Sequence, residues 1–309
     1  MAHHAEILVP CLDAVGARSV VEVGAFAGDL TRLLVEWAAR SDTRVLAIDP
    51  APKEELVRLA RERAELELIR QTSLEVLPRI PMPDVVIIDG DHNYYTVSEE
   101  LRLLGERARG AELPLLLFHD VCWPHGRRDD YFAPELIPEE FRQPIADDGD
   151  GLFPGDPGLR RRGLPYQRSA AREGGPRNGV LTAVEDFVAD RDDLRLVVVP
   201  VFFGFGAVWH GGAPWSRDLA DILDPWDRNP QLERLEANRV YHLAQAHSRQ
   251  VEVWTLQERQ RRQEAVLRRL LESSAFSVAE RLSRLRRRVG LGRAQPVISK
   301  DQIRRTLAD

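Results

Sequence analysis

The chain has few of the features that mark several large classes of protein. Only two of its 309 residues are cysteine, Cys11 and Cys122, and they lie far apart, so the sequence predicts neither a disulfide framework nor a zinc-binding pattern. No run of 18 apolar residues is present, which argues against a transmembrane helix. The N-terminus, MAHHAEILVP, lacks the charged start and long apolar core of a signal peptide. We therefore expect reduced thiols and a cytoplasmic location.

The chain also lacks a strong excess of one charge. Its net charge of −6 provides no overall basic field that would attract nucleic acid. A composition of 43% hydrophobic and 30% charged residues is ordinary for a folded globular protein. The length of 309 residues predicts one large domain with an appendage. We therefore expect no nucleic-acid partner.

The most informative segment is VVEVGAFAGDLTRLL, residues 20–34. An apolar run that contains Glu22 is followed by small residues, and a helical pattern begins at Leu30, which predicts a buried strand that turns sharply into a helix. Glycines in such a turn let the backbone approach a ligand, although any tight strand–helix turn needs glycine. The spacing also differs from the dinucleotide fingerprint G-x-G-x-x-G. A second strand ends at Asp49, about 20 residues after the turn, where a carboxylate can accept hydrogen bonds from ribose hydroxyls.

Apolar runs and helical patterns alternate through the first half of the chain. Strands are expected at 18–24, 44–49, 66–70, 84–89 and 113–119, and helices at 5–15, 28–40, 53–64, 73–79 and 96–109. After a further helix at 178–190, two more strands are expected at 194–201 and 203–210. Near-continuous apolar strands that alternate with helices indicate an α/β fold, in which a doubly wound, mostly parallel sheet is covered on both faces.

Polar side chains follow two neighbouring strands at the point where each ends. VVIIDGDHNYY, residues 85–95, supplies Asp89, Asp91 and His92, and LLLFHDVCW supplies His119 and Asp120. Ligands of open α/β sheets bind beyond the carboxyl ends of the strands, so we expect these five side chains to share one region. They suit a divalent metal site or a general base held by a carboxylate. The alternative is that they cap helices or face solvent.

Residues 5–212 resemble the class I S-adenosylmethionine-dependent methyltransferases. Their motif I, acid-x-Gly-x-x-x-Gly, is matched by Glu22, Gly24 and Gly28, and the acid that ends their second strand is matched by Asp49. The resemblance implies a Rossmann-like sheet of seven strands, the seventh antiparallel to the others. It implies that Gly24 and Gly28 line the methionine part of the cofactor, that Asp49 holds the ribose and that Ser73 contacts adenine. Ser73 is equally suited to be the N-cap of a helix at 74–79. The implied cofactor contacts are Glu22, Gly24, Ala25, Phe26, Gly28, Asp49, Ser73 and Asp89.

The sequence Asp-Gly-Asp-His followed by Tyr, with a His-Asp pair ending the next strand, is similar to the macrocin-type and cephalosporin-hydroxylase-like small-molecule enzymes. It more distantly resembles the catechol and caffeoyl-CoA O-methyltransferases. This resemblance implies a divalent metal held by Asp89, His119 and Asp120, and it places His92 where the catechol-type enzymes use a lysine base. An imidazole titrates nearer neutrality than an ammonium, so we expect His92, oriented by Asp91, to accept a hydroxyl proton. Mg, Mn and Zn all remain open, although imidazole favours Mn, Fe or Zn.

The resulting hypothesis is S-adenosylmethionine-dependent O-methylation of a polar small molecule, such as a sugar or a phenol. Two alternatives remain: a related fold without methyl transfer, either hydroxylase-like or a scaffold, and a macromolecule methyltransferase that uses the basic tail. We expect residues 1–215 to form the methyltransferase domain and an insertion at 121–177 to act as a lid that selects the substrate, because it is too long for a plain connection.

Two regions after the fifth strand carry separate expectations. Asn178 is predicted to be the N-cap of the helix that follows it. Residues 216–309 are expected to form a helical extension, which offers a route to a homo-oligomer. The basic run 281–293 predicts a solvated face or, alternatively, a contact with an anionic membrane or nucleic acid. Ser299 and Gln302 predict a capping box for a short last helix.

Overall fold

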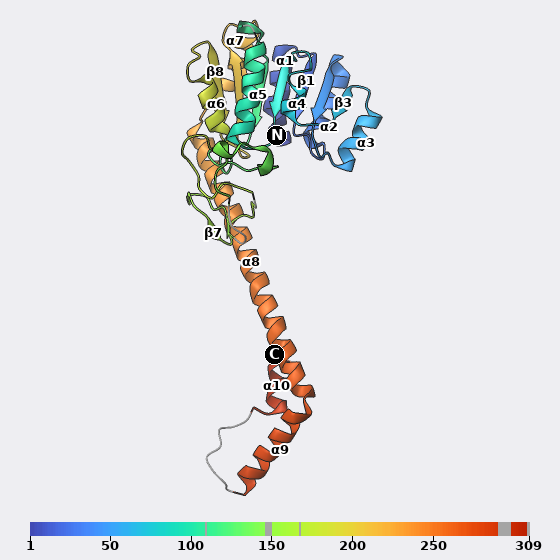
Figure 1. The fold of residues 1–309 in the computed structure, drawn as a ribbon, viewed down its shortest axis with the longest axis vertical. Coiled ribbons are helices and arrows are strands. Elements are labelled where there is room, and N and C mark those ends of the chain that lie inside the picture. The colour runs from blue at the N-terminus through green and yellow to red at the C-terminus, as the bar shows by residue number, and fades with distance from the viewer. Residues whose placement is uncertain (109, 146–149, 167, 290–297, 308–309) are drawn as a thin grey trace. The chain divides into compact units, whose positions relative to one another are not determined.

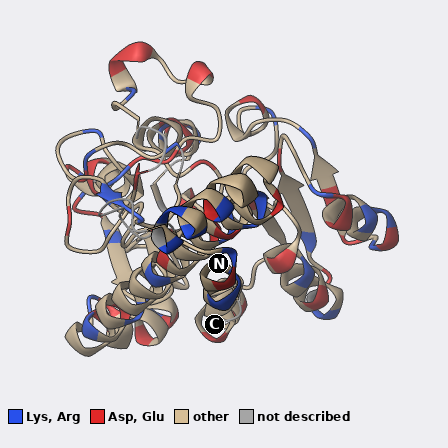
Figure 2. Ribbon diagram, turned by 90° about the horizontal axis from the view of Figure 1, so that it is seen from below, with Lys and Arg blue, Asp and Glu red and all other residues tan. Residues whose placement is uncertain are grey.

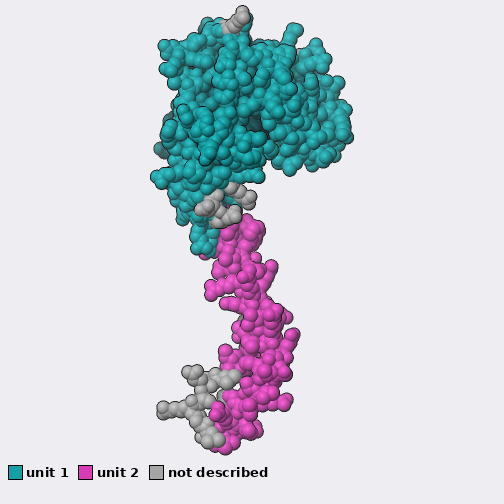
Figure 3. Space-filling view, viewed as in Figure 1, with its two compact units in different colours: residues 1–245 teal, residues 246–309 magenta. Residues whose placement is uncertain are grey.

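The computed structural model describes residues 1–108, 110–145, 150–166, 168–289 and 298–307 (Figure 1). The chain divides into two compact units, Met1–Gln245 and Ala246–Asp309 (Figure 3). Residues 216–245 lie in the first unit, and the domain boundary after residue 215 stays a prediction. Within the described ranges, every helix is too short or too polar to cross a membrane.

The first unit is built on a seven-stranded sheet with the order β3-β2-β1-β4-β5-β9-β8. The strands are β1 (Ser19–Val23), β2 (Arg44–Ile48), β3 (Leu66–Ile69), β4 (Val85–Ile88), β5 (Leu115–His119), β8 (Leu194–Val199) and β9 (Phe205–His210). Neighbours from β3 to β5 pair in parallel, and β9 pairs antiparallel with both β5 and β8. The predicted mostly parallel sheet of seven strands, with the last in sequence antiparallel, is therefore confirmed.

Helices cover both faces of this sheet because successive strand residues point to opposite sides. On β4, Val85 and Ile87 enter one apolar core, and Val86 and Ile88 enter the other. The first core is closed by α1 (Ala5–Val15), α2 (Asp29–Ser41), α3 (Glu54–Glu62) and α7 (Ser216–Leu223). The second is closed by α4 (Ser73–Val76), α5 (Tyr94–Arg107) and α6 (Val180–Val188). The doubly wound α/β fold is confirmed.

The turn from β1 into α2 brings two backbones into close contact. Gly24 has a φ of 84°, and a Cβ added there would lie 2.2 Å from the carbonyl oxygen of Asp89 and 2.3 Å from Cα of Gly90. Gly28, at φ 86°, is the N-cap of α2. Glycine at position 24 therefore lets the ends of β1 and β4 meet, which places Asp89 beside the turn.

This contact makes Gly24→Ala far more damaging than an alanine at an uncrowded left-handed glycine. Gly16 has a φ of 63° but no atom within 4 Å of an added Cβ, so Gly16→Ala is the matched control. We expect about 1–2 kcal/mol of lost stability for Gly16→Ala and about 3 kcal/mol or more for Gly24→Ala, because the latter adds a backbone clash. Urea unfolding of both variants tests this, and equal losses would contradict the packing described.

The insertion between β5 and α6 is held by a buried polar contact. The side chain of Asn178 accepts a hydrogen bond from the Asp129 backbone N–H at 2.8 Å and donates to the carbonyls of Arg172 and Gly174, each at 2.9 Å. Gly179 is the N-cap of α6, so the prediction that Asn178 caps this helix is wrong. Asn178 is instead buried, and the hydrogen bonds of its side chain go to the insertion.

Short elements complete the first unit. The insertion contains two antiparallel strands of two residues each, β6 (Asp150–Gly151) and β7 (Arg160–Arg161). Short 3-10 helices are η1 (Ala2–His4), η2 (Gly110–Glu112), η3 (Pro134–Leu136), η4 (Glu139–Phe141) and η5 (Asp224–Trp226). Figure 2 shows acidic and basic residues interspersed on the helices, for example on α3 at its right edge.

The C-terminal part is helical, as predicted. Its helices are α8 (Pro230–Glu272), α9 (Ser274–Arg288) and α10 (Lys300–Thr306). The predicted capping box is confirmed, because Ser299 Oγ accepts from the Gln302 N–H and Gln302 Oε1 accepts from the Ser299 N–H.

Candidate active site at the carboxyl ends of the strands

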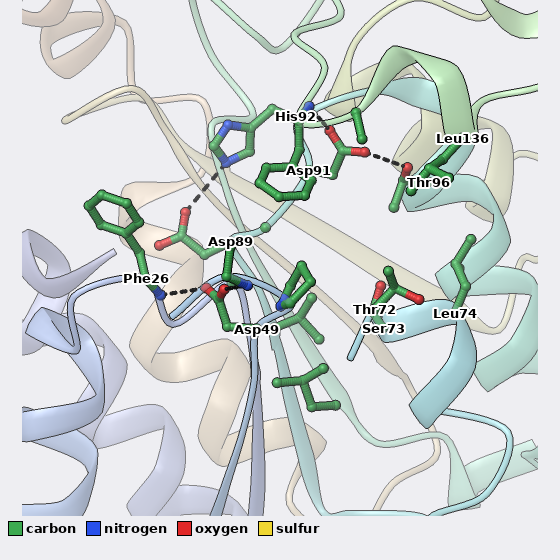
Figure 4. A pocket seen from close by; sticks show the side chains of 18 of the residues that line it. Phe26, Asp49, Thr72, Ser73, Leu74, Asp89, Asp91, His92, Thr96 and Leu136 are labelled. Carbon is green, nitrogen blue, oxygen red and sulfur yellow. Dashed lines mark hydrogen bonds and ion pairs between the residues drawn. The ribbon is translucent and has the colours of Figure 1, made fainter. Parts of the chain in front are cut away.

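A cavity of about 660 Å³ lies in the first unit beyond the ends of β1, β2 and β4 (Figure 4). The cavity is lined by seven of the predicted site residues: Gly24, Phe26, Asp49, Ser73, Asp89, Asp91 and His92. Glu22, Ala25, Gly28, His119 and Asp120 are not among the residues that line it. The cavity thus joins the glycine turn to the acid and imidazole side chains that follow β4.

Asp49 fixes the turn at one end of the cavity. Its Oδ2 accepts from the Phe26 N–H and its Oδ1 accepts from the Ala51 N–H, both at 2.7 Å, and the residue is only 7% exposed. Figure 4 shows the carboxylate beside the loop that carries Phe26. Each carboxylate oxygen can accept more than one hydrogen bond, so both retain capacity for a ligand hydroxyl.

Glu22 lies behind the cavity in the core. Its Oε2 accepts from the Thr31 hydroxyl at 2.7 Å, and burial raises the pKa of Glu22 to about 8. Protonated Glu22 therefore supports the β1–α2 turn from within at neutral pH. Its predicted contact with the cofactor stays a prediction.

This raised pKa gives a pH dependence of stability. Between its ordinary pKa of 4.5 and about 8, folded Glu22 keeps a proton that the unfolded chain releases. The free energy of unfolding therefore falls as pH rises through this window, by up to about 1.4 kcal/mol per pH unit. Glu22→Gln, which imitates the protonated group, is expected to show a flatter dependence in urea unfolding between pH 5.5 and 7.5. Parallel curves for the two proteins would refute the assignment.

The region around α4 forms another wall of the cavity. Thr72 is the N-cap of α4 and makes a capping box with Glu75, so the alternative in which Ser73 caps this helix is wrong. The Ser73 hydroxyl donates to the buried carboxyl of Glu100, whose pKa burial raises to about 8. Thr72, Ser73 and Leu74 all line the cavity.

The ends of β4 and β5 bring two carboxylates and two imidazoles together, as predicted. His92 Nε2 lies 3.2 Å from Asp120 Oδ2 and 3.6 Å from Asp89 Oδ1. His119 Nδ1 lies 2.9 Å from Asp120 Oδ2 and 3.1 Å from Asp89 Oδ1. The amino group of Met1 lies 3.3 Å from Asp89 Oδ2. We call Asp89, His92, His119 and Asp120 the strand-end cluster.

Charge within the strand-end cluster favours ionised side chains. Burial lowers the pKa of both imidazoles, but the adjacent carboxylates outweigh it and raise the pKa of His92 and of His119 to about 9. Burial likewise opposes ionisation of Asp89 and Asp120, yet the imidazoles hold the pKa of each carboxyl well below its usual range. The expectation that His92 titrates near neutrality is therefore wrong for the cluster as it stands.

Asp91 does not orient His92 through a hydrogen bond. Its Oδ1 accepts from the Phe132 N–H at 2.8 Å and its Oδ2 accepts from the Thr96 hydroxyl at 2.9 Å (Figure 4). Asp120 and Asp89 are the carboxylates next to the His92 ring nitrogen. Asp91 instead ties the insertion to the cavity, where Phe132, Ala133, Leu136 and Ile137 form an apolar wall.

His125 is a neighbour that the sequence did not indicate. Its ring stacks on His92 with centroids 5.3 Å apart and planes 18° from parallel. Tyr166 makes a T-shaped contact with His125, with centroids 5.0 Å apart. Burial lowers the pKa of His125, which favours the neutral form of this ring. The sequence offered one sign of this contact: His125 lies in the insertion, only five residues after Asp120.

Three residues of the cluster fit a divalent cation. Asp89, His92 and Asp120 each offer one ligand atom, and these atoms lie within 4.8 Å of one another. His92 Nε2 is buried, and its contacts with Asp120 and Asp89 are ion pairs and not well-aligned hydrogen bonds. A set of carboxylate and imidazole ligands suits Mn, Fe or Zn. His119 was predicted to be a ligand. Its Nε2 lies 3.1 Å from the carbonyl oxygen of Phe202, and its Nδ1 contacts the carboxylates of Asp89 and Asp120. Its role as a ligand stays a prediction.

One family model and several solved structures are similar to parts of this chain. Residues 21–121, which hold the turn, Asp49 and the strand-end cluster, match a family model described as a methyltransferase domain. Among solved structures, the chain is similar to the O-methyltransferase TomG from Streptomyces achromogenes in complex with SAM, at 17% identity over 68% of this chain and 80% of that chain, with a TM-score of 0.40. It is also similar to the SAH-bound methyltransferase PaMTH1 from Podospora anserina, at 14% identity over 65% and 76% of the two chains, with a TM-score of 0.38. No curated protein matches the chain.

Proposed function

We propose that this protein is an S-adenosylmethionine-dependent methyltransferase that methylates a hydroxyl oxygen of a polar small molecule, such as a sugar or a phenol. The observation that carries the proposal is that one cavity is lined both by Gly24 and Asp49 and by Asp89 and His92. The match of residues 21–121 to a methyltransferase domain model supports it.

The cofactor end of the cavity suits a nucleoside joined to a charged tail. Asp49 is positioned to accept hydrogen bonds from ribose hydroxyls while it holds the Phe26 and Ala51 N–H groups. The apolar side chains of Leu74, Leu136 and Ile137 suit the faces of an adenine ring. Gly24 lines the cavity, and we assign the methionine portion to the space beside it.

S-adenosylmethionine supplies a methyl group already activated on a sulfonium, so the chain has two tasks. The first is to align the acceptor oxygen with the methyl carbon, a contribution of several kcal/mol in enzymes generally. The second is to take the hydroxyl proton while the carbon–sulfur bond breaks and the carbon–oxygen bond forms. The acceptor is Nε2 of unprotonated His92, which is the minor form at neutral pH because the pKa of His92 is about 9. Asp120 and Asp89 then stabilise the imidazolium.

A divalent cation at the strand-end cluster would supply Lewis acidity in place of that base. Asp89, His92 and Asp120 would hold it, and it would lower the pKa of an acceptor hydroxyl. His119 would then orient both carboxylates from its Nδ1 side. Whether a metal takes part belongs to the proposal.

The test is methyl transfer from S-adenosylmethionine carrying a tritiated methyl group to panels of phenols and sugars. The reaction is run after chelation and again with Mg, Mn or Zn added. We expect label in a small acceptor in at least one condition, and transfer at least about 100-fold slower with the Asp120→Asn variant discussed below. Tight binding of S-adenosylmethionine with no transfer to any acceptor or cell extract would favour a related fold without methyl transfer.

The finer assignments remain part of the proposal. They are the macrocin-type or cephalosporin-hydroxylase-like subfamily, a cytoplasmic location, a small-molecule acceptor rather than nucleic acid, and a homo-oligomer formed through the C-terminal helices. The apolar wall formed by Phe132, Ala133, Leu136 and Ile137 supports a small acceptor, because these insertion residues border the cavity on one side.

A further inference from the structure

Helix α9 in the second unit exposes a continuous apolar stripe. Val278, Leu282 and Leu285 are 53%, 57% and 59% exposed, and Val289, directly after the helix, is 63% exposed. Their spacing of four, three and four residues places them on one side of a helix. Scattered exposed apolar side chains are ordinary on a protein surface, but four apolar side chains in register form a surface that water solvates poorly.

The stripe is not the face by which α9 packs within its own unit. Glu280 and Ser283 are only 9% and 8% exposed. Glu280 lies about 160° around the helix from Leu282, and Ser283 lies about 160° from Leu285, so both are on the side opposite the stripe. Ile303 of α10 is also buried, and Lys300 donates a hydrogen bond to the carbonyl of Leu271. The second unit therefore has its own packed face, and α9 turns its apolar stripe away from it.

Positive charge borders the stripe. The sequence of α9 holds five arginines and one acid, Glu280, which gives a net charge of +4 from five minus one. Arg281 and Arg288 lie on one flank of the stripe and Arg286 on the other, and all three are exposed. Arg284 pairs with Glu280 at 2.6 Å. The partner of this face must accept apolar side chains and carry negative charge beside them.

These two requirements decide between the possible partners. A second copy of α9 would bring the same arginines against each other, which like-charge repulsion disfavours. Nucleic acid would accept the arginines but leave the stripe in water. A helix with apolar residues on one side and arginines along its flanks is typical of helices that lie in the surface of an anionic bilayer.

We propose that α9 is a membrane-surface helix that attaches this protein to anionic lipid bilayers. Val278, Leu282, Leu285 and Val289 enter the boundary between headgroups and acyl chains, and the flanking arginines contact the anionic headgroups. The attachment is peripheral, since the described helices include none that could cross the bilayer. The proposal is independent of the reaction carried out in the first unit.

The experiment is co-sedimentation of the full chain with vesicles of phosphatidylcholine alone or of phosphatidylcholine mixed with phosphatidylglycerol. We expect at least about tenfold more bound protein on the anionic vesicles and weaker binding as salt is raised. Leu282→Ser with Leu285→Ser should reduce binding by about tenfold or more, because it removes apolar area from the stripe. The double variant Arg281→Gln/Arg286→Gln should lower binding to the anionic vesicles but leave binding to the phosphatidylcholine vesicles unchanged.

The matched control is Leu235→Ser with Leu243→Ser, which removes two exposed leucines, 64% and 42% exposed, from α8 in the first unit. It should bind vesicles like the parent chain, and far-ultraviolet circular dichroism should show equal helix content in all variants. Equal binding to neutral and anionic vesicles, or full binding by the stripe variant, would overturn the proposal. So would a stripe variant that loses only self-association in sedimentation velocity, or arginine-dependent binding to duplex DNA in place of vesicles.

Discussion

Asp120→Asn is expected to slow methyl transfer by about 10²–10⁴-fold while the affinity for S-adenosylmethionine changes little. Asp120 lies outside the cavity lining but is 3.2 Å from His92 Nε2 and 2.9 Å from His119 Nδ1, so its charge acts on both imidazoles. The amide keeps the shape but removes that charge. Asp120 has a φ of 57°, a conformation that asparagine tolerates, so the backbone should be preserved.

The measurement is the single-turnover rate of tritium transfer at saturating cofactor, with the cofactor affinity determined separately by calorimetry. Asp224→Asn is the matched control, since it makes the same chemical change at an exposed carboxylate paired with Arg195. That control should keep the parent rate. An Asp120→Asn enzyme as fast as the parent would show that the strand-end cluster takes no part in the reaction.

Asp49→Ala is expected to weaken binding of S-adenosylmethionine by about 100-fold or more, because hydrogen bonds to a charged carboxylate contribute about 1.5–3 kcal/mol each. The substitution removes the proposed ribose acceptor. It also leaves the Phe26 and Ala51 N–H groups without their carboxylate, which loosens the turn beside the cavity. Both effects act on binding, so saturating cofactor should restore much of the rate.

Calorimetric titration with S-adenosylhomocysteine tests this change without any acceptor. Asp218→Ala, which removes an exposed carboxylate from α7, serves as the control and should bind like the parent chain. If Asp49→Ala bound S-adenosylhomocysteine with unchanged affinity, the ribose would have to lie elsewhere.

The fold was predictable because its signals are local. Strands such as VVII and LLLF are apolar throughout, as buried parallel strands must be, and helical patterns separate them. The glycine at position 24 follows from the contact with Asp89 and Gly90. The convergence of Asp89 with Asp120 follows from the parallel pairing of β4 and β5, which puts both strand ends at one edge.

The partners inside the site were not predictable, because they depend on the path of the insertion. Asp91 adjoins His92 in sequence, yet its oxygens accept from Phe132 and Thr96. Asn178 precedes a helix, yet the insertion surrounds its side chain and Gly179 takes the cap. In each case a backbone group distant in sequence competes with the local partner. The spacing of residues along the chain does not indicate which distant backbone group will be close in the folded protein.

The most direct test of the account is a crystal structure of the full chain with S-adenosylhomocysteine. We predict that the ribose hydroxyls bind Asp49, that adenine lies against Leu74 and that the sulfur faces Asp89 and His92. A nucleoside bound outside this cavity, or a sulfur turned away from the strand-end cluster, would contradict the claim that one cavity joins cofactor and catalytic groups.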